Sequence, residues 1–257
     1  DWDMFQSHDA RGEFHAVARA ASGGPVYITD EPGKERAEVL RPLAFADGRL
    51  LMLDEPGQVT RDVLLTDVAM EPAALKVFGT VTRPGLKAGV VAAFNVNKGA
   101  RTVTGRISAE DVEGLLPAGG NAGAAAVAVY QRSSRSVVLL TGQNASRQFS
   151  LADFGHDLFT LVPASRGVAV FGLLDKYLGP AAVVSQSTEA DGVTVRLREA
   201  GDFGAWLERR PVGVELDGRA LPASAYSYER GLLRVPRSSF GGRTGERELR
   251  LLLAARR

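Results

Sequence analysis

The sequence predicts a mixed fold, in which two βα units in residues 1–66 precede an antiparallel β-sandwich in residues 67–257. Two observations lead to this prediction. Strand-like and helical hydrophobic periods alternate twice within about the first 45 residues, which is typical of a parallel sheet or barrel. After about Asp67 the helical period nearly disappears, and short β-rich runs follow at intervals of about 8 to 12 residues.

The first predicted unit joins a strand at residues 1–7 to a helix at residues 8–21. In the strand, Trp2, Met4 and Phe5 are interleaved with Asp and Gln at a period close to two. The residues that follow change to helical spacing, with one apolar stripe along the segment.

The second predicted unit begins with a short apolar strand at residues 26–28. Residues 31–33 then open an amphipathic helix whose buried face contains Val39, Leu40 and Leu43. Both predicted strands carry carboxylates near the loop that follows them. In a barrel, this edge is where the chemistry takes place.

The predicted sandwich strands are β-rich runs separated by Gly, Asn, Asp and Ser. Asp191-Gly192, Asp217-Gly218 and Arg230-Gly231 are candidates for hairpin turns, and a short helix capped by Ser108 is predicted up to Leu116. The runs are residues 75–82, 89–95, 103–107, 126–131, 136–140, 149–151, 157–162, 168–174, 182–188, 192–199, 201–208, 212–216, 232–235 and 249–253.

Composition excludes several classes of function. The net charge of +1 indicates neither a nucleic-acid surface nor a membrane surface, and no apolar run approaches the roughly 18 residues of a membrane span. Three scattered His and no Cys make no zinc site, and no phosphate-binding glycine loop is present. The absence of Cys fits a reducing compartment, and we expect a cytoplasmic location.

Several segments together resemble a known family. DWDMFQS at residues 1–7 and FHAVARAASGGPVYITDEPG at residues 14–33 are similar to blocks of the raffinose synthase and seed imbibition protein family, relatives of the family 36 α-galactosidases. The blocks that continue the resemblance, in the same order as in the family, are residues 46–67, 75–77, 89–95, 156–163 and 170–174. The resemblance covers essentially the whole chain.

This resemblance implies that residues 1–66 are the last two βα units of a (β/α)8 barrel, and that the N-terminal part of the barrel is a missing partner. It also implies an α-galactoside oligosaccharide substrate and a retaining mechanism with two carboxylates, without a cofactor or a metal. In the family both are Asp residues on earlier strands, so we assign no catalytic residue here and expect this chain alone to be inactive. Because residues 175–182 depart from the plant synthase pattern, we favour α-galactosidase-like hydrolysis of raffinose-type sugars. The alternative is galactosyl transfer from galactinol to sucrose.

Asp3 and Met4 are the candidate substrate-binding residues, because DWDM resembles a block that lines the galactose pocket of related α-galactosidases. A carboxylate there can accept hydrogen bonds from sugar hydroxyls. The alternative for Asp3 is a buried side chain that ties the strand to its neighbours. Asp1 is expected to be structural, and Trp2 to pack between the barrel and its helices, with a platform for stacking a sugar ring as the alternative.

His8, Asp30 and the other two histidines are the remaining candidates. His8 follows the first strand, where a contact to the acceptor sugar and a solvated loop residue are both open. Asp30 ends the second strand, as a pocket residue or a helix cap. His15 and His156 are expected to be structural.

A function of a different class is a non-catalytic β-sandwich that binds carbohydrate or supports a partner chain. Such a surface needs a row of exposed aromatic side chains on one face. Aromatic residues make up only 7% of the sequence and fall mostly at positions with an apolar pattern, which argues against this alternative.

Overall fold

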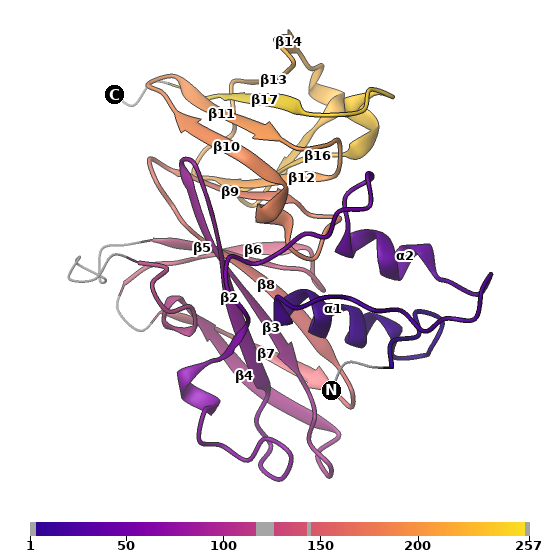
Figure 1. The fold of residues 1–257 in the computed structure, drawn as a ribbon. Coiled ribbons are helices and arrows are strands. Elements are labelled where there is room, and N and C mark those ends of the chain that lie inside the picture. The colour runs from indigo at the N-terminus through magenta and orange to yellow at the C-terminus, as the bar shows by residue number, and fades with distance from the viewer. Residues whose placement is uncertain (1–3, 117–125, 143–144, 255–257) are drawn as a thin grey trace.

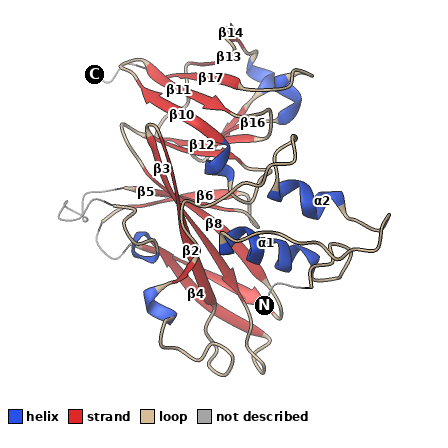
Figure 2. Cartoon of the chain, in the orientation of Figure 1, coloured by secondary structure: helices blue, strands red, loops and turns tan. Residues whose placement is uncertain are grey.

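The computed structural model describes residues 4–116, 126–142 and 145–254. Two α-helices lie together on one side of a series of antiparallel sheets (Figure 1; Figure 2). The helices are α1 (Gly12–Ser22) and α2 (Ala37–Leu40), and α2 continues directly into the 3-10 helix η1 (Arg41–Leu43). No helix in the described part of the chain is long and apolar enough to cross a membrane.

Helix α1 confirms the helix predicted in this region. Ala16, Val17 and Ala20 form its buried face, which packs against strands of the neighbouring sheet. Gly23 ends the helix in a left-handed conformation, at φ 69°, which glycine adopts without a steric penalty. The second predicted helix is shorter than expected: it begins at Ala37 and not near residues 31–33, and it ends at Leu40 because Pro42 has no N–H with which to continue an α-helix.

The two predicted N-terminal strands are not formed, so this part of the prediction is wrong for the described residues. Residues 4–6 and 25–30 have no regular secondary structure, and residues 1–3 lie outside the described chain. The two segments do run side by side, with the Thr29 N–H donating to the Phe5 carbonyl at 2.8 Å. That is their one backbone–backbone hydrogen bond among the described residues, and a strand requires a continuous ladder of such bonds.

The larger sheet has six strands, and a two-stranded sheet packs against it. Every pairing between neighbouring strands of the six-stranded sheet is antiparallel. In spatial order the six strands are β1 (Gln58–Val59), β2 (Leu75–Arg83), β3 (Leu86–Phe94), β8 (His156–Pro163), β5 (Val127–Gln131) and β6 (Ser136–Leu140). The smaller sheet pairs β4 (Thr102–Ser108) with β7 (Ser146–Ala152).

Two further sheets face each other at the C-terminal end of the chain (Figure 1). One contains β10 (Val183–Thr188), β11 (Gly192–Leu197), β17 (Arg247–Leu252), β13 (Gly213–Leu216) and β14 (Arg219–Ala220). The other contains β15 (Ser227–Glu229), β16 (Leu232–Val235), β12 (Phe203–Leu207) and β9 (Val168–Leu173). The predicted β-rich runs are therefore confirmed as strands, but they form two stacked pairs of sheets where a single sandwich was expected.

Most local turn and cap signals in this region are confirmed. Asp217-Gly218 and Arg230-Gly231 both have positive φ at both residues and close the β13–β14 and β15–β16 hairpins. Asp191 lies in the loop between β10 and β11, but Gly192 is the first residue of β11, so these two residues do not form a two-residue turn. Ser108 caps the 3-10 helix η3 (Ala109–Asp111) in a capping box, although that helix is one turn where a longer one was expected.

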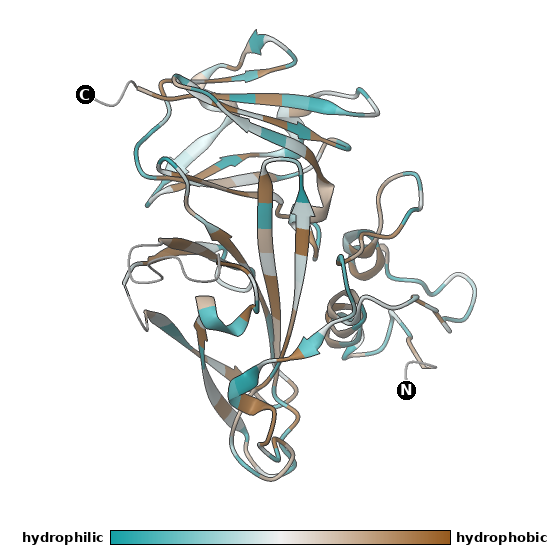
Figure 3. Ribbon diagram, turned by 60° about the vertical axis from the view of Figure 1, so that its left-hand side comes forward, coloured by the Kyte–Doolittle hydropathy of each residue, from teal (hydrophilic) through white to brown (hydrophobic). Residues whose placement is uncertain are grey.

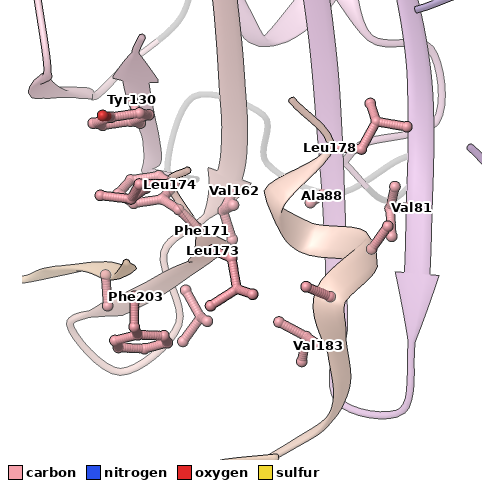
Figure 4. Close-up of a cluster of buried hydrophobic side chains, with 14 of the residues drawn as sticks. Val81, Ala88, Tyr130, Val162, Phe171, Leu173, Leu174, Leu178, Val183 and Phe203 are labelled. Atoms are coloured by element: carbon pink, nitrogen blue, oxygen red, sulfur yellow. The ribbon is translucent and has the colours of Figure 1, made fainter. Parts of the chain in front are cut away.

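The apolar core joins the helices to the sheets. One buried cluster extends from Phe5 and Val17 through the six-stranded sheet to Leu251 in β17. Figure 3 shows apolar and hydrophilic stretches alternating along the strands, as expected where one face of a strand is buried. In the centre of this cluster, Phe171, Leu173 and neighbouring side chains from several strands fill the space between the sheets (Figure 4).

Candidate functional site

The candidate site lies where the segments around Phe5 and Thr29 end side by side. In addition to the backbone bond, the Gln6 side-chain amide donates to the Thr29 carbonyl at 3.4 Å. This contact places the residues that follow each segment, His8 and Asp30, next to each other. The sequence separates them by a whole helix, and the structure brings them together.

His8 and Asp30 form a directed pair. The His8 Nδ1 atom lies 2.7 Å from Asp30 Oδ1, and the His8 backbone N–H donates to the same oxygen at 3.2 Å. The Asp30 side chain is only 1% exposed, whereas the His8 side chain is 35% exposed. The Asp30 carboxylate is therefore shielded from solvent, whereas the His8 imidazole beside it is partly exposed.

The charge state of Asp30 follows from this geometry. Burial pushes the pKa of its carboxyl up, but hydrogen bonds from Ser7 and His8 together outweigh burial and hold the pKa below its ordinary value. Since an ionised carboxylate only accepts hydrogen bonds, Nδ1 of His8 carries the proton. In neutral His8 the other ring nitrogen, Nε2, is then a hydrogen-bond acceptor oriented by Asp30, as in a base held by a carboxylate.

Met4, one of the two predicted substrate-binding residues, precedes Phe5 in the first of the two segments and is 63% exposed. The other, Asp3, lies outside the described residues, as do Asp1 and Trp2. Tyr27 and Ile28 are also exposed, at 63% and 49%. Three large apolar side chains are thus exposed on the two segments that meet at Phe5 and Thr29.

The other two histidines have packing contacts, as expected. The His156 ring packs edge-on against Phe14 with ring centroids 5.9 Å apart, and burial lowers the pKa of His156. Burial also lowers the pKa of His15, and the nearby Arg19 guanidinium adds to this effect. Neither is part of the His8–Asp30 pair.

Sequence reasoning named His8 and Asp30 separately but missed their pairing. The available signal was that each residue follows one of two consecutive predicted strands, whose ends are neighbours in a parallel arrangement. Among the residues that the structure describes, no group of three or more His, Asp or Glu is placed to hold a metal ion.

Comparison with known proteins places this geometry in context. Residues 1–236 match the family described as raffinose synthase or seed imbibition protein Sip1. The chain is 30% identical over 257 residues to a probable galactinol–sucrose galactosyltransferase 6 of Arabidopsis thaliana, covering 91% of this chain and 34% of the relative. It is 30% identical over 262 residues to a galactinol–sucrose galactosyltransferase of Oryza sativa subsp. japonica, covering 91% and 32%.

The chain thus spans about a third of the length of the curated relatives that it matches. Among solved structures, α-galactosidase I from Mortierella vinacea superposes with a TM-score of 0.42 at 12% identity, covering 62% of this chain and 38% of that one. This likeness is too distant to carry an argument about fold or function.

Proposed function

Because the chain belongs to the raffinose synthase or seed imbibition protein family, we propose that it is part of an enzyme that transfers α-galactosyl groups between sugars. The names of its relatives, which are galactinol–sucrose galactosyltransferases, support transfer over the hydrolysis that the sequence favours. We propose further that residues 1–66 are the last two βα units of a (β/α)8 barrel and that residues 67–257 are its C-terminal β domain.

The His8–Asp30 pair is the observation that connects the proposed function to particular residues. It lies at the ends of two adjacent extended segments, each followed by a helix, which is where a barrel places its binding groups. In this proposal Nε2 of His8 accepts a hydrogen bond from a hydroxyl of the acceptor sugar, and Asp30 fixes the orientation of the ring. Asp3 and Met4 line the neighbouring part of the pocket.

The exposed apolar side chains of Met4, Tyr27 and Ile28 support the same arrangement. Soluble proteins seldom leave large apolar side chains grouped on adjacent segments without a partner. In the proposed enzyme, the remaining barrel strands cover these residues and complete the hydrogen-bond ladder beside Phe5 and Thr29. The two carboxylates of the retaining mechanism belong to those strands, so this chain contributes binding rather than the nucleophile.

The test uses the longer polypeptide that results if the coding frame continues upstream of Asp1. We expect it to convert galactinol and sucrose to a trisaccharide faster than it releases free galactose. The Asp30→Asn variant should lose about tenfold in kcat/KM, since His8 loses its charged hydrogen-bond partner. Asp9→Asn, an exposed carboxylate in the same loop, is the matched control and should leave the rate unchanged.

Release of galactose without transfer would replace this proposal with hydrolysis. A frame that begins at this chain, with no separate polypeptide that restores activity, would overturn the catalytic proposal.

A further inference from the structure

A second candidate binding site lies between the helices and the sheets. It is a cavity of about 400 Å³, within the range of small-molecule sites. Glu13 and Glu38, in the first turns of α1 and α2, form one wall. The turn after β5 and the end of β9 form the other walls of the cavity. The residues that line it are Glu13, Glu38, Pro42, Tyr130, Arg132, Ser133, Arg135, Leu174, Asp175, Asp202 and Arg234. None of them belongs to the His8–Asp30 pair.

Tyr130 is the buried polar group of this cavity. The residue is only 4% exposed, and no described residue forms a hydrogen bond with its hydroxyl, which lies in the cavity wall and is open to a ligand. The ring is fixed by Phe171, with centroids 5.6 Å apart, and lies beside Leu174 (Figure 4). Burial raises the pKa of Tyr130 despite the nearby guanidinium groups, so the hydroxyl stays protonated and available as a donor.

The charged groups around Tyr130 are of both signs. Three guanidinium groups (Arg132, Arg135 and Arg234) are donors, and four carboxyl groups (Glu13, Glu38, Asp175 and Asp202) provide acceptors. Because the three guanidinium groups and four carboxyl groups nearly balance, the cavity favours neither an anionic nor a cationic ligand. A neutral polyhydroxylated ligand suits both sets, because each hydroxyl both donates and accepts a hydrogen bond.

The arginines differ in their availability. Arg132 is fixed in the wall, since it donates to the carbonyls of Leu174 at 2.8 Å and Lys176 at 3.1 Å and lies over the Tyr177 ring. The Arg234 and Arg135 side chains have no hydrogen bond or ion pair to any described residue. Their guanidinium groups are therefore free to bind a ligand.

We propose that this cavity, defined by Tyr130, Arg234 and the carboxylates opposite them, binds a neutral saccharide. Arg234 and Tyr130 donate to its hydroxyl oxygens, while Glu13 and Asp202 accept from its hydroxyl groups. The side chains of Pro42 and Leu174 supply apolar surface for the C–H face of a sugar ring.

The test is calorimetric titration of the 257-residue chain with sucrose and raffinose, and separately with inorganic phosphate as the anionic probe. We expect saturable binding of at least one saccharide and none of phosphate. Arg234→Ala should weaken saccharide binding about tenfold, and Tyr130→Phe, which keeps the ring, about fivefold. Arg101→Ala removes an exposed arginine on the loop before β4, outside the cavity, and serves as the matched control.

Binding of phosphate alone, or no saccharide binding, would overturn the inference. So would saccharide affinity that is unchanged in both Arg234→Ala and Tyr130→Phe, provided that circular dichroism shows both variants folded. Because this experiment measures binding to the chain itself, its outcome is independent of whether the longer polypeptide transfers galactose.

Discussion

Lys176 Nζ lies 3.0 Å from Glu199 Oε1 at the junction between the helical segment and the C-terminal sheets. The same ammonium donates to the carbonyls of Arg41 at 3.1 Å and Ala44 at 2.5 Å, and the Ala46 N–H donates to Glu199 at 2.6 Å. Both side chains are almost fully buried. The Lys176–Glu199 ion pair and its backbone hydrogen bonds thus hold the segment after α2 against the C-terminal sheets.

We expect Lys176→Met to lower the free energy of unfolding by about 3 to 5 kcal/mol, because it leaves the Glu199 carboxylate buried without a counter-charge. Urea denaturation measures this loss. Arg196→Met, which removes the exposed pair with Glu246, is the control and should cost less than about 1 kcal/mol. Equal losses in the two variants would contradict the role given to the buried pair.

A second buried ammonium, that of Lys76 in β2, lies 2.5 Å from Asp111 and 2.7 Å from Asp62. Burial raises the pKa of Asp111, although Lys76 opposes this effect. Lys76→Met should therefore destabilise the protein by several kcal/mol, about 3 to 5 in comparable pairs. Adding Asp111→Asn should restore part of the loss, since the unpaired buried carboxylate is then gone. A double-mutant cycle in which the two losses simply add would refute this coupling.

The Asp30 carboxyl should make stability depend on pH. Its pKa in the folded protein lies below the ordinary value of 3.8, so the unfolded chain binds more protons in this range. The contribution is complete above pH 3.8 and is lost as the pH falls through the folded pKa. Melting temperatures of the parent and of Asp30→Asn should therefore converge in acid. A difference that stays constant down to acid pH would rule out this linkage.

Gly172 and Gly218 both have positive φ but differ in their surroundings. A Cβ on Gly172 would overlap the Gly179 carbonyl oxygen, whereas nothing lies within 4 Å of one on Gly218. We expect Gly218→Ala to cost only the left-handed backbone penalty, about 1 to 2 kcal/mol. Gly172→Ala should cost about 1 to 3 kcal/mol more, because the backbone must move. Thermal unfolding of the two variants compares them directly, and equal costs would mean that the β9 region relaxes freely.

Much of the β architecture could be predicted from local sequence. Asp217-Gly218 and Arg230-Gly231 mark their hairpins because the turn needs two residues with positive φ, which Gly adopts readily and Asp tolerates. Arg230 has no such preference, and the glycine after it carries the turn signal there. Strand periodicity likewise marks where β2 and β8 lie. It does not determine which strands share a sheet, and the division into two stacked pairs depends on contacts between distant residues.

The sequence by itself determined the family, the helix α1, the hairpin turns and the strand positions, since these depend on short-range periodicity and turn chemistry. The tertiary structure alone decided that His8 meets Asp30, that Lys176 meets Glu199, and that Tyr130 faces a cavity with charges of both signs. These contacts join residues from separate elements. Their proximity comes from packing between elements, and periodicity shows which face of an element is buried but not which distant residues it meets.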